Sequence, residues 1–273
     1  MKKIFTLCAI ALLSLASCGK DEGPDLPPIS SSSVLPKRVT YIEKSNDEND
    51  QDEDKSIKNI TYNGNKINEI TTSVGSRDVY TYTGDFITKI TSLNVKNEII
   101  ETDDFSYDHN GKLISVVTIS NNMNSEGELI TTKNKDVYTH NSDGTIVQES
   151  YRFDLDGKEV KDDGSTIFTV SNGNVIKEVR TSGDQNNINV NIYEDEYDNK
   201  KSPFSNITGF DRLIFDAPTS RNNPLKSKYQ HIYNNVVQSS STHIYTNTYS
   251  TDGYLLFSSF VGDDYSGSES YEY

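Results

Sequence analysis

The sequence contains no tryptophan, two cysteines, two methionines and four histidines. It has no Gly-x-Ser-x-Gly elbow, His-Glu-x-x-His pair, phosphate-binding loop or cysteine nucleophile, so nothing in it predicts an enzyme, a cofactor or a metal site. Basic residues are also scarce. The formal net charge of −15 excludes the basic face that DNA or RNA binding requires. Hydrophobic residues make up 33% of the chain, below the roughly 45–50% of ordinary soluble domains. This composition favours one curved sheet over two packed layers.

The histidines and acidic residues leave a few chemical alternatives open. His231 and His243 fall in late predicted strands, where we interpret them as solvent-facing; the alternative is a metal pair across a hairpin. The acidic run from Asn46 to Asp54 contains Asp50, Asp52 and Asp54 at the spacing that opens a calcium loop. Lys55 stands where that loop needs glycine, and Thr61 where it needs glutamate, so we predict a solvated loop.

Residues 1–17 read as a secretory signal peptide, with Lys2 and Lys3 before an apolar run that is too short to span a membrane. The signal ends in Leu15-Ala16-Ser17-Cys18, which resembles a bacterial lipobox. The resemblance implies that Cys18 becomes the lipidated first residue of the mature chain. Cys8 leaves with the signal, so no disulfide is expected. Removing two lysines takes the net charge from −15 to −17.

Lys20, Asp21 and Glu22 follow the cysteine and resemble the export tag of Bacteroidetes surface lipoproteins. The resemblance implies an outer-membrane protein that faces the cell exterior and meets the membrane through the Cys18 lipid alone. The alternative is a solvated tether whose charges carry no signal. Residues 18–37 are rich in proline and serine, which predicts a flexible spacer ahead of a single folded domain, residues 38–273.

The folded domain is built on a repeat of an aromatic residue, a glycine turn and an isoleucine. Four copies share this order, and in each the isoleucine stands three residues after the glycine: Gly64 and Ile67, Gly84 and Ile87, Gly111 and Ile114, Gly173 and Ile176. Glycine supplies the positive φ of a tight turn, so each copy predicts a β-hairpin. The sixth residue after each glycine is also β-branched. Either both faces are partly covered, or a β-bulge turns both residues inward; we favour the bulge.

Glycine and asparagine turns recur along the chain, and consecutive hairpins usually pair in order. We therefore predict an all-β antiparallel meander that forms one large, twisted, partly curled sheet resembling an open barrel. The pattern breaks near residues 203–224. There Phe204, Ile207, Phe210 and Leu213 recur every third residue, which predicts a short irregular or helical cap at one end of the sheet.

The tyrosine–glycine units resemble the YD repeats of Rhs-type proteins, and the whole layout is similar to uncharacterised Bacteroidetes lipoproteins of the DUF4595-like kind. The resemblance implies architecture and location, not activity. Our first hypothesis is a non-enzymatic surface scaffold that binds a glycan or protein through exposed tyrosines. The second is an envelope carrier that holds a lipid or other apolar molecule in the curled sheet. The third is a hydrolase with an unrecognised carboxylate pair.

Overall fold

The computed structural model describes residues 34–46, 53–123, 126–184, 186–213, 220–263 and 265–273. The signal peptide, Cys18 and the tag at Lys20, Asp21 and Glu22 lie outside these ranges, as do Asp50 and Asp52. The described part of the chain is almost entirely β-structure. In chain order the strands are β1 (Arg38–Ser45), β2 (Glu53–Asn63), β3 (Lys66–Thr72), β4 (Arg77–Thr83), β5 (Phe86–Leu93), β6 (Ile99–Tyr107), β7 (Leu113–Met123), β8 (Leu129–His140), β9 (Thr145–Phe153), β10 (Glu159–Lys161), β11 (Gly164–Ser171), β12 (Asn174–Ser182), β13 (Asn189–Tyr197), β14 (Pro224–Tyr233), β15 (Val236–Tyr249), β16 (Leu255–Val261) and β17 (Tyr265–Glu272).

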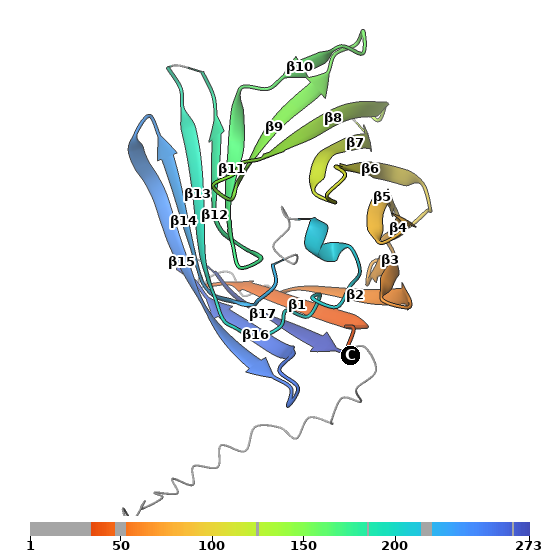
Figure 1. The fold of residues 1–273 in the computed structure, drawn as a ribbon, viewed down its shortest axis with the longest axis vertical. Coiled ribbons are helices and arrows are strands. Elements are labelled where there is room, and N and C mark those ends of the chain that lie inside the picture. Colours follow the sequence, from red (N-terminus) through yellow and green to blue (C-terminus); the bar gives the residue numbers. More distant parts are fainter. Residues whose placement is uncertain (1–33, 47–52, 124–125, 185, 214–219, 264) are drawn as a thin grey trace, which may run out of the picture.

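These strands form a closed, antiparallel barrel (Figure 1). Each strand pairs with the next, except that β9 pairs with β11 while the short β10 pairs with the far end of β9. The last strand returns to the first, with Arg38 opposite Glu272 and Ser45 opposite Tyr265. The result is a 16-strand up-and-down barrel with β10 as an addition. The predicted all-β meander is confirmed, and the sheet curls all the way to closure.

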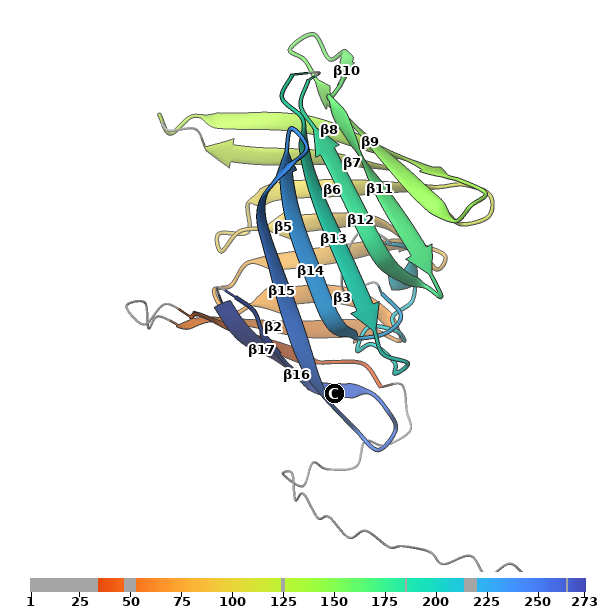
Figure 2. The ribbon, with the colours of Figure 1, turned by 90° about the vertical axis from the view of Figure 1, so that its left-hand side faces the viewer.

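The two ends of the barrel are different. We call one the plugged end: it holds both described chain ends and the turns that follow β2, β4, β6, β8, β11 and β15. We call the other the mouth: it holds the turns that follow β3, β5, β7, β9, β12, β14 and β16. Figure 2 shows the barrel from the side, with the β7–β8 hairpin projecting at the mouth.

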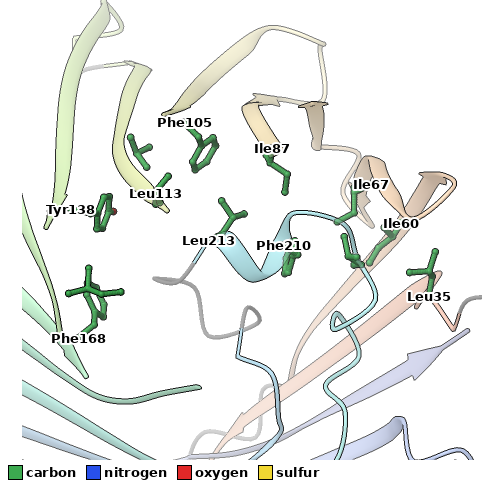
Figure 3. Packing of buried hydrophobic residues seen from close by; sticks show 13 residues of the cluster. Leu35, Ile60, Ile67, Ile87, Phe105, Leu113, Tyr138, Phe168, Phe210 and Leu213 are labelled. Atoms are coloured by element: carbon green, nitrogen blue, oxygen red, sulfur yellow. The ribbon is translucent and has the colours of Figure 1, made fainter. Parts of the chain in front are cut away.

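A barrel of this size is too wide for its own side chains to fill. The connection between β13 and β14 enters the plugged end and supplies the missing filling, and we call its described residues, 198–213 and 220–223, the plug. Phe210 and Leu213 point from it into a buried cluster (Figure 3). Ile207 belongs to the same cluster, which residues of β1–β9, β11 and β12 complete. The predicted cap near 203–224 is therefore an internal plug. It covers no sheet edge, because a closed barrel has none.

Hydrogen bonds and one glycine fix the plug. Asn223 is 1% exposed, and its side-chain amide donates to Asp198 Oδ2 at 3.2 Å and to the carbonyl of Lys201 at 3.3 Å, which joins the two ends of the plug. Gly209 precedes the single turn of 3₁₀-helix, η1 (Phe210–Arg212), with a φ of 78°. A Cβ at Gly209 would lie 2.6 Å from the carbonyl oxygen of Asp85, so only glycine allows this close approach.

The predicted bulge is present in all four repeat hairpins, but it does not bury all four isoleucines. Ile67 and Ile87 are buried at 1% and 0% exposure, as predicted. Ile114 and Ile176 are 40% and 37% exposed, so the inward placement predicted for them is wrong. The register shifts show why. The unpaired extra residue is Asn68 in the first hairpin, whereas Ile114 and Ile176 are themselves the extra residues of the third and fourth.

The glycine occupies different places in the four loops, and this difference moves the register. Gly64 and Gly84 come first in two-residue loops, because Asn63 pairs with Lys66 and Thr83 with Phe86. Gly173 comes second in its loop, and Gly111 comes last in a longer one closed by the Lys112 carbonyl, which accepts from the Asp108 amide. Counting from the glycine thus overshoots by one residue in the last two copies. The inward residues there are Leu113, which is 2% exposed, and Val175.

The tyrosines of the second and third repeats, and two more at the plugged end, have a role that the sequence did not reveal. Each reaches across to the neighbouring hairpin and bonds the backbone of the inward residue beside that hairpin's bulge. Tyr107 donates to the carbonyl of Ile87 at 2.7 Å, and the Tyr82 hydroxyl accepts from the amide of Ile67 at 3.1 Å. The same tie joins Tyr197 to Val175 and Tyr273 to Leu255. Consecutive repeats are therefore tied laterally on the inside of the barrel.

The chain reaches β1 through Val34, Leu35 and Pro36, which are buried at the plugged end. The Asn206 amide of the plug donates to the carbonyl of Val34 at 3.1 Å, and the Tyr62 hydroxyl donates to that of Pro36 at 2.7 Å. The prediction that the flexible spacer extends to residue 37 is wrong for these three residues, which pack as part of the folded domain.

Candidate lumenal binding site

A candidate site lies in the lumen, on the mouth side of the plug. Leu213 of the plug and inward-facing residues of seven strands surround a cavity of about 400 Å³. Its apolar lining consists of Ile90, Phe105, Val116, Tyr138, Phe168 and Leu213. Its polar lining consists of Asp103, Thr118, Asp136, Gln148, Thr166, Glu178 and Arg180. The cavity is therefore amphipathic, with an apolar floor over the plug and polar walls toward the mouth.

Carboxylates reach the lumen because strand side chains alternate between the two faces. Five strands that run from the mouth toward the plug carry an acid two residues before an aromatic ring that faces inward. The pairs are Asp78 and Tyr80, Asp103 and Phe105, Asp136 and Tyr138, Asp195 and Tyr197, and Glu269 and Tyr271. This acid-x-aromatic spacing is the sequence signal that would have located the lumen. Without the closed barrel, these acids are indistinguishable in sequence from ordinary surface charge.

Hydroxyl groups on the adjacent strand hold most of these carboxylates. Thr118 donates to Asp103 and Ser150 to Asp136, both at 2.6 Å. Ser92 donates to Asp78 at 2.7 Å. Such bonds fix the orientation of each carboxylate and compensate part of its desolvation. The acids thus form an ordered lining on the wall from β4 to β9.

Burial changes the proton affinity of two of these acids. It raises the pKa of Asp103, an effect that the hydrogen bond from Thr118 partly offsets and that the nearby charge of Glu101 reinforces. Burial likewise raises the pKa of Asp195, against hydrogen bonds from Ser227 and Tyr197. Both shifts have the direction expected for a carboxyl group removed from water.

Arg180 is the cation of the cavity lining. Its guanidinium is ion-paired with Glu178, which raises the pKa of Arg180. It also lies over the ring of Tyr193, 5.1 Å from the ring centroid, the geometry of a cation–π contact. The cavity therefore offers an anionic wall, a paired cation and aromatic faces within a single space.

The two late-strand histidines lie inside the barrel, and our prediction that they face solvent is wrong. His231 contacts Asn189, with Nε2 3.2 Å from the side-chain oxygen. His243 packs against the rings of Phe260 and Tyr265, with centroids 5.5 and 4.7 Å away. Within the described ranges, no group of three or more histidine, cysteine or acidic side chains is arranged to hold a metal ion.

The outer face of the barrel carries ion pairs in the middle of its strands. Lys89 bonds Asp104 at 2.9 Å, and Lys177 bonds Glu194 at 2.8 Å. Three of the four, Lys89, Asp104 and Lys177, are next in sequence to a residue that lines the cavity, so alternation places them outside. Glu194 pairs with Lys177 and lies on the same outer face. A lysine at the lipid face of a membrane barrel costs about 2–4 kcal/mol at the bilayer midplane. These pairs suit an outer face that is in water. No helix in the described ranges is long and apolar enough to cross a membrane.

Two further hollows lie away from the lumenal cavity. One, of about 590 Å³, surrounds the plug between Phe204 and Arg221. The other, of about 710 Å³, lies beside the turn between β11 and β12 and reaches Glu194 and Tyr197. The first is lined largely by residues of the plug, and the second is lined by them in part, so we assign both to the scaffold.

Comparison with known proteins identifies the fold and nothing further. No family-level sequence model and no curated protein sequence matches the chain. Among solved structures, a porin-like protein from Bacteroides vulgatus is similar over 88% of this chain and 99% of its own, with a TM-score of 0.54 and 13% identity. A porin-like protein from Bacteroides uniformis covers 87% of this chain and 97% of its own, with a TM-score of 0.34 and 12% identity. At such identities the first likeness extends to the fold alone, and the resemblance to YD repeats stays a prediction.

Proposed function

We propose that this protein is a lipid-anchored binding protein of the bacterial outer membrane that holds a small amphipathic ligand in the lumen of its barrel. The observation that carries the proposal is the amphipathic cavity above the plug. Ligand sites in proteins are concave, mostly apolar, and equipped with a few placed polar groups. A plug that only filled space would need no such ordered polar lining. The porin-like name of the Bacteroides vulgatus neighbour supports an envelope location for this chain.

The lipid anchor rests on the lipobox-like ending at Cys18. Fifteen residues lie between Cys18 and Val34, and the sixteen steps from one to the other span at most about 55 Å. Val34 contacts the plug, so the tether joins the barrel at its plugged end. The plugged end then lies nearer the membrane, and the mouth points away from it. The ion pairs on the outer face support a barrel that stands beside the bilayer.

An amphipathic ligand suits the lumen better than a fully apolar one. Our carrier hypothesis requires a contiguous apolar concave face. The apolar part of the lumen is instead largely covered by Ile207, Phe210 and Leu213 of the plug. What stays accessible is the mixed lining, in which Asp103, Arg180 and Phe105 face the same cavity. A lipid chain in that space would desolvate charged groups without compensation.

Binding is also favoured over hydrolysis. A glycosidase needs one carboxyl group that keeps its proton and one that stays ionised on either side of the scissile bond. Of the three acids in the cavity lining, Glu178 is paired with Arg180 and Asp136 accepts a bond from Ser150. Asp103 has the raised pKa that a proton donor would need. The other two carboxylates, Glu178 and Asp136, are held by these bonds, so neither is free to act as the second catalytic group beside Asp103.

Blocking the cavity tests lumenal binding. Gln148 lines the cavity, and its strand neighbour Val147 faces outward. We expect native mass spectrometry of the protein released from envelopes to find a bound small molecule in the wild type and in Val147→Trp. Gln148→Trp should lack that molecule while keeping the wild-type melting temperature. Equal occupancy in all three proteins would refute a lumenal site.

The anchor is tested separately. Metabolic labelling with an alkyne fatty acid should mark the wild type and leave Cys18→Ala unlabelled. Protease added to intact cells should digest the wild type if the barrel faces outward. Label that persists without Cys18 would contradict the anchor, and protection from protease would place the barrel on the periplasmic side.

A further inference from the structure

The turns at the mouth carry exposed apolar residues, whereas the described turns at the plugged end consist mainly of glycine and polar residues. Met123 and Leu129 in the β7–β8 hairpin are 70% and 67% exposed, and Leu155 between β9 and β10 is completely exposed. Val95, between β5 and β6, is 62% exposed. The described plugged-end turns are instead built from residues such as Gly64-Asn65, Gly84-Asp85 and Asn172-Gly173. The two ends of the barrel therefore differ in how many apolar side chains their turns expose.

Three consecutive hairpins place several of these side chains on one sector of the mouth. We call this sector the mouth patch, and it consists of Val95, Ile99, Met123, Leu129, Ile130 and Leu155. The hairpins are neighbours in the barrel because β6 pairs with β7 and β8 with β9. Figure 2 shows the β7–β8 hairpin extending beyond the adjacent strands. The patch therefore projects into solvent, away from the buried cluster at the other end.

Folding does not account for the mouth patch. Hairpin tips are best built from glycine, asparagine and aspartate, whose backbones suit tight turns. An apolar side chain there gains nothing from burial, since it remains in water on the folded barrel. Single exposed apolar residues are common on protein surfaces, but gathered ones mark an interaction site. The mouth patch is thus an interaction surface.

The charge of the same hairpins selects the partner. Glu98, Glu126, Glu128, Asp154 and Asp156 stand among the apolar tips, against Lys96 and Lys158. We infer that the mouth patch docks a cationic amphipathic peptide, whose apolar face covers Met123, Leu129 and Leu155 while its lysines or arginines meet the acids. A second copy would bring two acidic mouths together. An anionic bilayer would be repelled in the same way. This inference goes beyond lumenal binding and does not depend on it.

The test uses a synthetic amphipathic peptide of leucine and lysine, and two control peptides in which glutamate replaces lysine or serine replaces leucine. The mouth variant is Met123→Ser, Leu129→Ser and Leu155→Ser together. A matched control variant, Ile114→Ser with Ile176→Ser and Phe257→Ser, removes side chains that are 40%, 37% and 40% exposed away from the mouth. Fluorescence anisotropy measures binding at low and high salt. Melting curves establish that both variants fold.

We expect the leucine–lysine peptide to bind the wild type and the control variant alike, and the mouth variant at least about tenfold more weakly. Binding should weaken with salt, and both control peptides should bind less well. Equal binding to the mouth variant, or equal binding of the serine–lysine peptide, would overturn the inference. Mouth-dependent dimerisation or binding to anionic vesicles without peptide binding would overturn it in favour of those partners. The Gln148→Trp variant should bind the peptide normally, which separates this test from that of the lumen.

Discussion

Substituting the repeat isoleucines one at a time tests the most specific structural result, the split between Ile87 and Ile114. Both stand three residues after a turn glycine, so a rule counted from the glycine treats them alike. In the structure, Ile87 is 0% exposed and packs in the cluster that includes the plug, while Ile114 is 40% exposed. Deleting most of a buried isoleucine costs about 2–5 kcal/mol of unfolding free energy. Ile87→Ala should therefore be strongly destabilising.

The exposed partner should behave differently. Ile114→Ala loses little burial, and what remains is the β-propensity of the residue, a scale that spans only about 1 kcal/mol. For a domain of this size, 1 kcal/mol shifts the melting temperature by roughly 2–4 °C. We expect Ile87→Ala to lower the melting temperature by about 7–14 °C and Ile114→Ala by less than about 4 °C.

The assay is thermal unfolding of the purified protein followed by circular dichroism at one wavelength, with urea unfolding as a second measure. Leu113→Ala is the decisive companion, because Leu113 is 2% exposed and takes the inward place that Ile114 does not. We expect Leu113→Ala to lower the melting temperature by about as much as Ile87→Ala does. Equal losses for Ile87→Ala and Ile114→Ala, or a small loss for Leu113→Ala, would refute the register that we assign to the bulges.

Three further predictions concern the ties, the plug and the lumen. Tyr107→Phe leaves the carbonyl of Ile87 without its hydroxyl donor and should cost about 1–3 kcal/mol in urea unfolding; no change would show that the tie is dispensable. Gly209→Ala drives a Cβ against Asp85 and should expose the plug to limited proteolysis, whereas Gly64→Ala, with a φ of 63° and open space around it, should leave the plug protected. Burial raises the pKa of Asp103. The contribution of the protonated Asp103 carboxyl group to folding stability is therefore complete below the unfolded pKa of about 3.9, and it is lost as pH rises through the folded pKa. Asp103→Asn should therefore gain stability relative to the wild type between pH 3 and pH 7, and a parallel pH profile would argue against a buried carboxyl.

Local rules predicted local structure well. Asn-Gly and Gly-Asp turns located the repeat hairpins, and the spacing of two β-branched residues located a bulge in each of them. The same rules failed for Ile114 and Ile176 because hairpin register depends on the loop type, and glycine is compatible with several places in a loop. The offset of one residue between Gly64 and Gly173 in their loops was enough to reverse which face an isoleucine occupies.

Long-range features could not be read in the same way. Closure depends on pairing β1 with β17, strands at opposite ends of the domain, and no local pattern specifies that pairing. The plug illustrates the same limit. The period of Ile207, Phe210 and Leu213 predicted a short apolar turn, but only a barrel too wide for its own side chains explains why that turn lies inside. The acids of the lumen were hidden for the same reason.

The distribution of these features along the barrel bears on where function lies. The glycine turns and bulges of the four repeat hairpins, the tyrosine ties and the plug all belong to the plugged end. The mouth turns lie outside these repeats, and two of them adjoin bulges of their own, between β5 and β6 and between β14 and β15. Exposed side chains such as Met123 and Leu155 stand in these turns. In a barrel of this kind the repeat therefore identifies the scaffold, and binding specificity is expected where the repeat is absent: in the mouth turns and in the lumen that they surround.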